Sequence, residues 1–276
     1  MTTRTASAAA LLPIVGVAVW LGGGVWVAFL SALASGAAWE ALGLTETTRD
    51  PAARAIGSIA AGGVVAAAAG AIRLAPGDVL ALTVVAALAL QLHRAPAQRS
   101  AACWATTVAV ASYAGLLLGY AAQLRLSPGG LPWTAGLLGL VWANDSAAYV
   151  AGRRLGRAPL APDTSPKKTW EGFVAGAIAT VVVALALPWL SAHLAAPEGA
   201  GFGGAPPAFL LAMGLAVALA APLGDLAQSF LKRQAGVKDS GALIPGHGGL
   251  LDRLDSLMFA APVVYAAAAI LPRLGT

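Results

Sequence analysis

Charged residues and glycines are concentrated between positions 229 and 255 of a chain that is otherwise largely apolar. The stretch reads SFLKRQAGVKDSGALIPGHGGLLDRLD. Its cations are suited to bind phosphate groups, and its carboxylates are suited to bind a divalent metal ion. The residues that could do this chemistry are Lys232, Arg233, Lys238, Asp239, His247, Gly248, Gly249, Asp252, Arg253 and Asp255. This concentration favours an enzyme over a scaffold.

Two of the carboxylates, Asp252 and Asp255, stand three positions apart at the expected start of the last helix. At that spacing they share one helix face, where they repel each other unless a cation lies between them. Mg²⁺ is a good candidate, because it prefers oxygen ligands and is usually shared with substrate phosphates. The alternative is an acidic first turn that stabilises the helix dipole, which explains one Asp better than two.

A third carboxylate, Asp225, follows more than two turns of apolar residues in AVALAAPLGDLAQSFLKR. An ionised carboxylate at that depth is costly unless it is paired or bound to a metal ion. Pro222 and Gly224 are expected to loosen the helix beside it and to free backbone carbonyls. Two interpretations stay open: a metal ligand or proton carrier, and a structural carboxylate paired with an Arg of a neighbouring helix.

The turn IPGHGG precedes Asp252. Gly248 and Gly249 allow backbone N–H groups to approach a phosphate, and the N-terminus of the following helix favours an anion. Gly-rich turns between helices are common, so the turn alone is weak evidence. His247 within it is either a phosphate donor, an acid–base group or a simple hydrogen-bonding loop residue.

The cations Lys232, Arg233 and Lys238 fit two roles equally well when each is considered singly. They are phosphate ligands, or they are topology determinants that contact lipid headgroups. Asp239 follows Lys238 directly. Since a headgroup anchor needs no carboxylate, Asp239 favours a binding site.

A second polar cluster covers residues 142–172 and reads WANDSAAYVAGRRLGRAPLAPDTSPKKTWEG. Asp145 precedes Tyr149 by one helical turn, so both lie on one face. Lys167 and Lys168 stand between two hydroxyl residues, a combination that fits a polyphosphate site. A cytoplasmic basic loop with a helix-capping turn explains the same residues.

The elements that carry these residues are expected to be membrane helices. The chain is 58% hydrophobic and 11% charged, with a mean hydropathy of +0.77, whereas a soluble domain carries about 25% charged residues. A bilayer core takes about 20 apolar residues per helix. We predict an all-α, polytopic integral membrane protein with about nine transmembrane helices, near residues 8–21, 24–44, 55–74, 76–91, 100–121, 130–151, 171–193, 206–231 and 250–271.

Fourteen of the seventeen Lys and Arg residues lie at the N-terminus or in and beside alternate connections between these spans. Only Arg73, Arg125 and Arg273 fall on the opposite side of the predicted membrane. Because basic loops stay cytoplasmic, the N-terminus is predicted to be cytoplasmic. The basic balance is thereby explained by topology and anionic headgroups, and no nucleic-acid partner is needed.

Most of the twelve acidic residues lie in the second half of the chain. We therefore predict that residues 1–125 form transmembrane helices that serve as a scaffold and supply dimer contacts. Residues 126–276 are predicted to form the catalytic transmembrane region.

The motif residues resemble those of the phosphatidate cytidylyltransferases, also called CDP-diacylglycerol synthases. The positions that match the family pattern are Ser229, Leu231, Lys232, Arg233, Lys238, Asp239, Gly241, Ile244, Pro245, His247, Gly248, Gly249, Leu250, Asp252, Arg253, Leu254 and Asp255. A pattern of this length is highly specific. The spacing of Asp145, Tyr149 and Gly152 and the segment SPKKTWEG also match, so the resemblance covers about residues 140–271. The first half is similar only in being hydrophobic with several spans, and in carrying Trp39 and Glu40 near the end of the second.

The resemblance implies transfer of a cytidylyl group from CTP to phosphatidate, which yields CDP-diacylglycerol and pyrophosphate. It implies a homodimer in the inner (cytoplasmic) membrane, with the active site facing the cytoplasm. It also implies a need for Mg²⁺, with K⁺ as a candidate second cation. The implied metal ligands are Asp225 and Asp252, and the implied catalytic residues are Asp225, Lys238, Asp239, His247 and Asp252. The implied substrate-binding residues are Asp145, Lys167, Lys168, Ser229, Lys232, Arg233, Gly248, Gly249, Arg253 and Asp255.

Two alternatives belong to other classes. A membrane polyprenol or phytol kinase would use similar cations and Mg²⁺, but the complete motif belongs to the cytidylyltransferases. An ion-coupled transporter would use Asp145 and Asp225 as carriers, yet it would have no need of the Gly-His-Gly-Gly turn and the cations near it.

Overall fold

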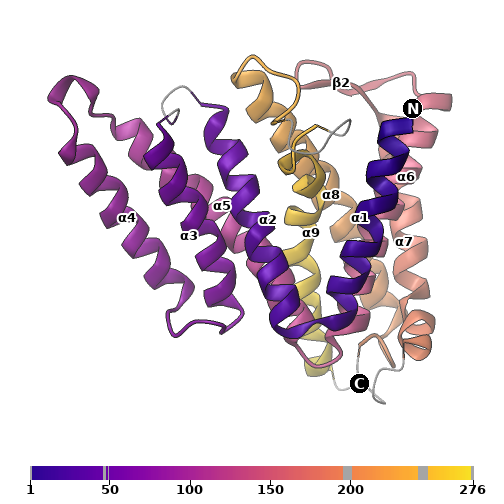
Figure 1. Ribbon diagram of the computed structural model, residues 1–276. Helices are drawn as coiled ribbons and strands as arrows, with labels where there is room; N and C mark the ends of the chain where they lie inside the picture. The colour runs from indigo at the N-terminus through magenta and orange to yellow at the C-terminus, as the bar shows by residue number, and fades with distance from the viewer. Residues whose placement is uncertain (1, 46–47, 49, 195–200, 242–247, 275–276) are drawn as a thin grey trace. The chain divides into compact units, whose positions relative to one another are not determined.

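The computed structural model describes residues 2–45, 48, 50–194, 201–241 and 248–274. Within these residues the chain forms nine α-helices and one small hairpin (Figure 1). The helices are α1 (Thr2–Leu21), α2 (Gly23–Gly43), α3 (Pro51–Ala68), α4 (Pro76–His93), α5 (Ala101–Leu126), α6 (Gly130–Leu155), α7 (Trp170–His193), α8 (Pro207–Gln234) and α9 (Leu251–Ile270).

The nine helices follow the nine predicted spans in order, which confirms the all-α membrane architecture. Seven of them, α2, α3, α4, α5, α7, α8 and α9, are long and apolar enough to cross a membrane. In α1, side chains are described only from Leu12, and the apolar stretch Leu12–Leu21 within that part is shorter than the seven. Helix α6 carries Asn144, Asp145, Arg153 and Arg154, so its polarity separates it from the seven.

Helices α1 and α2 are separate elements that run in opposite directions from a glycine turn (Figure 1). Gly22 and Gly23 both have positive φ angles, of 60° and 48°. Glycine adopts this region without the steric penalty that a Cβ atom brings. The glycine pair therefore ends the first helix rather than only kinking it.

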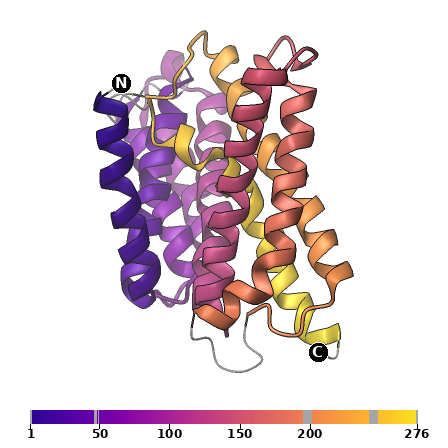
Figure 2. The ribbon, with the colours of Figure 1, turned by 90° about the vertical axis from the view of Figure 1, so that its right-hand side faces the viewer.

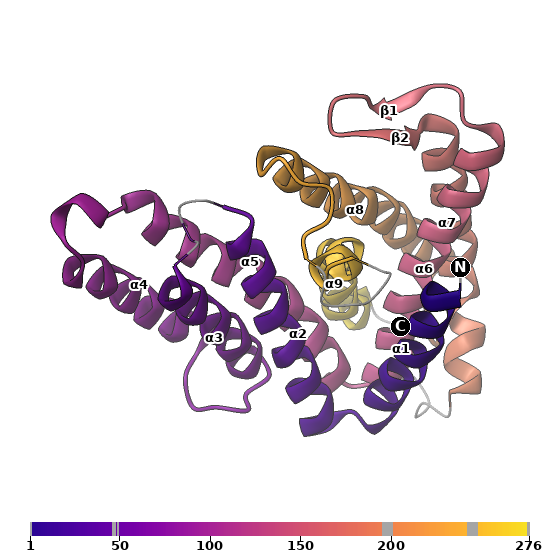
Figure 3. The ribbon, with the colours of Figure 1, turned by 45° about the horizontal axis from the view of Figure 1, so that its top comes forward.

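One element departs from the predicted pattern. Residues 157–169, expected to form an irregular basic loop, contain an antiparallel hairpin of β1 (Pro159–Ala161) and β2 (Ser165–Thr169), shown in Figure 3. Glu171 accepts hydrogen bonds from the backbone N–H groups of Arg157 and Ala158, and the Trp170 N–H donates to the Ala158 carbonyl. These bonds hold the two ends of the segment together. The residues of the segment do not alternate between apolar and polar, so the sequence pattern does not predict a hairpin here.

The chain divides into two compact units that interleave along the sequence. Unit 1 comprises Met1–Gln123 and Gln234–Leu254, and unit 2 comprises Leu124–Arg233 and Asp255–Thr276. The division passes through α5 and α9. The assignment of a scaffold role to residues 1–125 stays a prediction.

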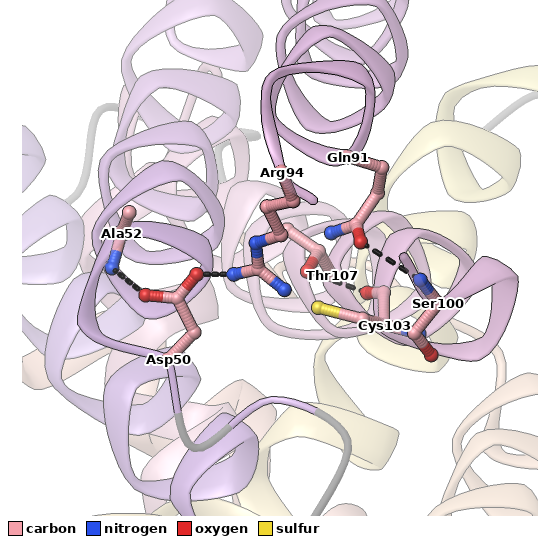
Figure 4. A network of polar contacts seen from close by, with 7 residues as sticks. All are labelled: Asp50, Ala52, Gln91, Arg94, Ser100, Cys103 and Thr107. Carbon is pink, nitrogen blue, oxygen red and sulfur yellow. Dashed lines mark hydrogen bonds and ion pairs between the residues drawn. The ribbon is translucent and has the colours of Figure 1, made fainter. Parts of the chain in front are cut away.

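In unit 1, polar side chains connect the ends of α3, α4 and α5 (Figure 4). Asp50 accepts a hydrogen bond from the Ala52 N–H, which caps α3, and forms an ion pair with Arg94. Gln91 accepts from the Ser100 N–H at 3.0 Å, ahead of α5. Caps of this kind satisfy backbone groups that have no partner within the helix.

In unit 2, α6 and α7 lie side by side (Figure 2) and approach closely through small residues. A Cβ atom on Gly172 would lie 2.8 Å from the Ala148 carbonyl oxygen. At the middle of the pair, Asn144 Nδ2 donates to Thr180 Oγ1 at 3.0 Å, and both residues are buried. Small residues and a buried hydrogen bond of this kind commonly hold membrane helices together.

The close contact of α6 with α7 yields a stability prediction. Gly172→Ala should lower the melting temperature in detergent, because two helix backbones would have to separate, at a cost of about 1–3 kcal/mol. Gly139→Ala, on the partner helix α6, is the matched control, since its Cβ would meet Val183 of α7 at an ordinary 3.9 Å. Equal melting temperatures for the two variants would contradict the packing described here.

Candidate functional site

The predicted site residues fall into two polar clusters, one in each unit. The Asp252 cluster of unit 1 consists of Glu40, Asp239, Ser240, Gly241, Gly248, Gly249, Leu251 and Asp252. The Asp225 cluster of unit 2 consists of Asp145, Lys168, Asp225, Ser229, Asp255 and Ser256.

Asp252, in the first turn of α9, organises the loop that precedes this helix. Its Oδ2 atom accepts three hydrogen bonds: from the Ser240 N–H at 3.0 Å, the Ser240 hydroxyl at 3.1 Å and the Gly249 N–H at 3.1 Å. Donors from both ends of the loop thus converge on one carboxylate oxygen. Asp252 therefore does more than stabilise the helix dipole.

Asp239 and Asp252 both lie close to Gly248. A Cβ atom on Gly248 would be 3.2 Å from Asp252 Oδ2 and 3.6 Å from Asp239 Oδ1. Gly248 also has a φ of +81°, which a side chain disfavours. The structure thus brings together two predicted catalytic carboxylates beside a glycine whose backbone conformation disfavours a side chain.

Glu40, on α2, is a member of the Asp252 cluster that the sequence analysis did not select. Its side chain is buried, with 5% of the residue exposed. Oε2 accepts hydrogen bonds from the Ser240 hydroxyl at 3.0 Å and from the Leu251 N–H at 2.9 Å. The signal in the sequence was an acidic residue near the end of an apolar span, where an ionised carboxylate is costly unless it has a partner.

In the Asp225 cluster, Asp225 is paired with a cation. Lys168 Nζ, from β2, lies 2.7 Å from Asp225 Oδ2 and donates to the Pro222 carbonyl oxygen at 3.4 Å. The Ser229 hydroxyl, one turn further along α8, donates to Asp225 Oδ1 at 3.4 Å. The cation beside Asp225 is therefore a hairpin Lys rather than the Arg of a neighbouring helix considered from the sequence.

Gly224 allows α8 and α9 to approach each other next to Asp225. A Cβ atom on Gly224 would come within 2.3 Å of the Asp255 carbonyl oxygen. Asp255 lies close enough to Asp225, Asp145 and Lys168 to interact with them electrostatically. The Ser256 hydroxyl donates to Asp145 Oδ1 at 3.4 Å, which connects α9 to α6. Three carboxylates from three helices thus lie near one another, and Lys168 pairs with one of them.

The remaining predicted residues lie at the surface or outside the description. Lys167, Arg233, Lys238 and Arg253 are exposed, and Lys232 is half-buried. His247 falls outside the described residues. The exposed cations are accessible to anions, and their roles as substrate ligands stay predictions.

The donor chemistry of both clusters fits Mg²⁺, because carboxylate and hydroxyl oxygens are the ligands this ion prefers. Within the described ranges, no three side chains of Asp, Glu, His or Cys come together as a metal site. Asp225 belongs to unit 2 and Asp252 to unit 1, and their assignment as metal ligands stays a prediction.

A family model described as the Cytidylyltransferase family matches residues 2–271. The chain belongs to this family. The family expected from the motif of residues 229–255 is thereby confirmed. The match also includes the N-terminal half, where the sequence analysis found little resemblance.

Curated relatives named "Phosphatidate cytidylyltransferase" are similar to part of the chain. The protein of Brucella suis biovar 1 is 46% identical over 134 residues, which are 49% of this chain and 46% of the relative. That of Haemophilus influenzae is 44% identical over 123 residues, 45% of this chain and 41% of the relative. That of Bacillus subtilis is 39% identical over 156 residues, 56% of this chain and 54% of the relative. The chain spans about half the length of the curated relatives it matches.

The ion pair of the Asp225 cluster can be tested with a double-mutant cycle. Lys168→Met and Asp225→Asn should each lower the stability of the purified protein, and their effects should fall short of additivity by about 0.5–1 kcal/mol, as for a partly exposed pair. The side chains of Lys168 and Asp225 are 22% and 38% exposed, so solvent screens their attraction. Lys167→Met, at the exposed neighbouring position of β2, should be additive with Asp225→Asn. Additivity in both cycles would show that the pair does not contribute.

Proposed function

We propose that this protein transfers a cytidylyl group from CTP to phosphatidate, producing CDP-diacylglycerol and pyrophosphate. The observation that carries the proposal is the complete motif of residues 229–255, whose Asp252 accepts three hydrogen bonds that hold its loop. Membership of the cytidylyltransferase family and the names of the relatives support the same activity.

In the proposed reaction, a phosphate oxygen of phosphatidate attacks the α-phosphorus of CTP. A new P–O bond forms as the bond between the α-phosphorus and the oxygen that leads to the β-phosphate breaks. Pyrophosphate leaves with the electron pair of that bond. The phosphatidate phosphate is ionised near neutral pH, so no strong general base is required, and His247 is assigned a positioning role.

Both substrates are anions, so the protein has to align them and compensate their charge. Lys232, Arg233, Lys238 and Arg253 are the proposed phosphate ligands near the motif, joined by Lys167 and Lys168 of the hairpin. Bound Mg²⁺ would supply electrostatic stabilisation of the phosphate oxygens and the leaving pyrophosphate. Asp225 and Asp252 are its proposed ligands, and K⁺ is a candidate second cation.

CTP is a cytoplasmic substrate and phosphatidate a membrane lipid, so the reaction needs a site at the cytoplasmic surface that is open to lipid. The proposed orientation supplies this, because the basic loops carry the phosphate-binding residues and such loops stay cytoplasmic. We accordingly propose a multi-pass protein of the inner membrane with a cytoplasmic N-terminus. A homodimer is proposed from the family resemblance.

The activity is tested with purified protein, CTP, phosphatidate and Mg²⁺ in detergent micelles. Wild-type protein should form CDP-diacylglycerol, and removal of Mg²⁺ with a chelator should stop the reaction. Phosphorylation of a polyprenol or of phytol, without formation of CDP-diacylglycerol, would replace the proposal with a lipid kinase.

Asp252→Asn separates the charge of this carboxylate from its hydrogen bonds. An Asn carbonyl oxygen can accept the bonds that Asp252 accepts from Ser240 and Gly249, so the variant should remain folded. Its turnover should fall at least about 100-fold if the charge is needed at a metal ion. Near-normal turnover of the folded variant would remove Asp252 from the proposed metal site.

The orientation is tested with reporter fusions. Nine spans and a cytoplasmic N-terminus predict that a C-terminal reporter lies outside the cytoplasm. A cytoplasmic signal from that reporter would require an even number of spans or the opposite orientation.

A further inference from the structure

Glu40 is a buried carboxylate in the N-terminal half of the chain, and the proposed reaction assigns it no role. Its Oε2 atom accepts two hydrogen bonds, whereas its Oε1 atom has no hydrogen-bond partner among the described residues. Burying a carboxylate that is only partly hydrogen-bonded is costly. Helix packing alone would be served by an alanine, so the side chain requires another explanation.

The partners of Glu40 are the two ends of the loop that carries the Gly-rich turn. Ser240 lies before the turn, and Leu251 is the first residue of α9. Glu40 Oε2 accepts from the Ser240 hydroxyl at 3.0 Å and from the Leu251 N–H at 2.9 Å. One oxygen atom of α2 thus joins both ends of the loop, and it satisfies a backbone donor at the start of α9 that has no partner within that helix.

The loop is shaped to receive this carboxylate. A Cβ atom on Gly241 would lie 2.5 Å from Glu40 Oε1, and one on Gly249 would lie 2.4 Å from Glu40 Oε2. Gly241 is therefore explained by the approach of Glu40, and Gly249 by the approach of Ser240 and Glu40 together, rather than by a phosphate alone. Glu40 and Ser240 are 200 positions apart in the sequence, so this contact forms only when the chain has folded.

Ser240 connects Glu40 to Asp252. Its hydroxyl lies 3.0 Å from Glu40 Oε2 and 3.1 Å from Asp252 Oδ2, and its backbone N–H also donates to Asp252 Oδ2. Any displacement of Ser240 therefore moves two of the three donors to Asp252. A side chain that holds Ser240 also sets the position of the Asp252 carboxylate.

We infer that Glu40 is a positioning residue of the site: it holds Ser240 and Leu251 and thereby fixes Asp252 and Gly249 for substrate and metal binding. It acts through these residues and does not touch the substrates. The expected effect of Glu40 on kinetics rests on the proposed function. The anchoring of the loop by Glu40 does not depend on that function.

The anchoring is tested first, without an activity measurement. Hydrogen–deuterium exchange is followed in peptides that cover residues 236–254 of the full-length protein. Glu40→Ala should exchange at least about tenfold faster there than wild type, because protection is lost where an anchoring bond is removed. Glu40→Gln keeps one carbonyl oxygen for Ser240 and Leu251 and should exchange like wild type.

Asp78→Ala is the matched control for these variants. Asp78 is an acidic residue of the same unit whose carboxylate caps α4 by accepting from the Ala75 N–H. Its replacement should leave exchange at residues 236–254 and the turnover unchanged. Ser240→Ala is the second test variant: it removes the shared hydroxyl alone, and it decides the question if Glu40→Ala does not fold.

The kinetic consequence is then measured in the assay with CTP and phosphatidate. Glu40→Ala and Ser240→Ala should each lower kcat about tenfold and raise the Mg²⁺ concentration for half-maximal activity, as replacements of residues that support metal ligands do. KM for CTP should change less, and Glu40→Gln should recover most of kcat. A purely structural role would lower the amount of active protein without moving the Mg²⁺ dependence.

Three results would overturn the inference: unchanged exchange at residues 236–254 in Glu40→Ala, faster exchange with unchanged Mg²⁺ dependence and kcat, or a Glu40→Gln variant as impaired as Glu40→Ala. Failure of the proposed function has a different signature. Wild-type protein would then form no CDP-diacylglycerol, while the exchange measurements would still decide whether Glu40 anchors the loop.

Discussion

The convergence of hydrogen-bond donors on the carboxylate oxygens of Glu40 and Asp252 is the interaction on which the Asp252 cluster depends. A loop that joins two membrane helices leaves backbone N–H groups unpaired at the start of the second helix. Here the Leu251 N–H donates a hydrogen bond to Glu40, and the N–H groups of Ser240 and Gly249 donate to Asp252. These bonds hold Ser240, Gly249 and Leu251 beside the two carboxylates.

The glycines of the two clusters make such approaches possible. Gly241 and Gly249 make room for the carboxylate of Glu40, and Gly248 lies close to those of Asp239 and Asp252. In unit 2, Gly224 lets the backbone of α8 reach that of α9 beside Asp225. Gly172 of α7 likewise allows its backbone to come close to the backbone of α6. Close backbone approach thus serves both helix packing and the placement of polar groups in an apolar chain.

Much of this organisation could be predicted from the sequence. Runs of Ala, Leu and Val with few charges indicated nine helices, because only helices satisfy their own backbone groups in lipid. The motif of residues 229–255 indicated the family, and its spacing indicated that Asp252 and Asp255 belong to one helix. The hairpin of β1 and β2 was not predicted, since it is closed by Glu171 and by backbone bonds rather than by an alternating pattern.

The role of Glu40 could not be derived from local sequence, because its partners are about 200 positions away. The pairing of Lys168 with Asp225 is of the same kind: a strand residue and a helix residue meet only once the chain has folded. Sequence spacing gives the face of a helix on which a residue lies, and it does not give the side chain that meets it. The sequence indicated only that Glu40, as a carboxylate in an apolar helix, needs a hydrogen-bonding or charged partner. It did not indicate which residue that partner is.

The central claim is that the motif of residues 229–255 serves transfer of a cytidylyl group to a lipid phosphate. The most direct measurement compares two preparations of CTP, one labelled with ³²P at the α-phosphate and one at the γ-phosphate, in parallel reactions with phosphatidate. The account predicts that the α-label enters the lipid fraction and that the γ-label is released as pyrophosphate. Incorporation of the γ-label into lipid, with the α-label remaining in the aqueous phase, would contradict it.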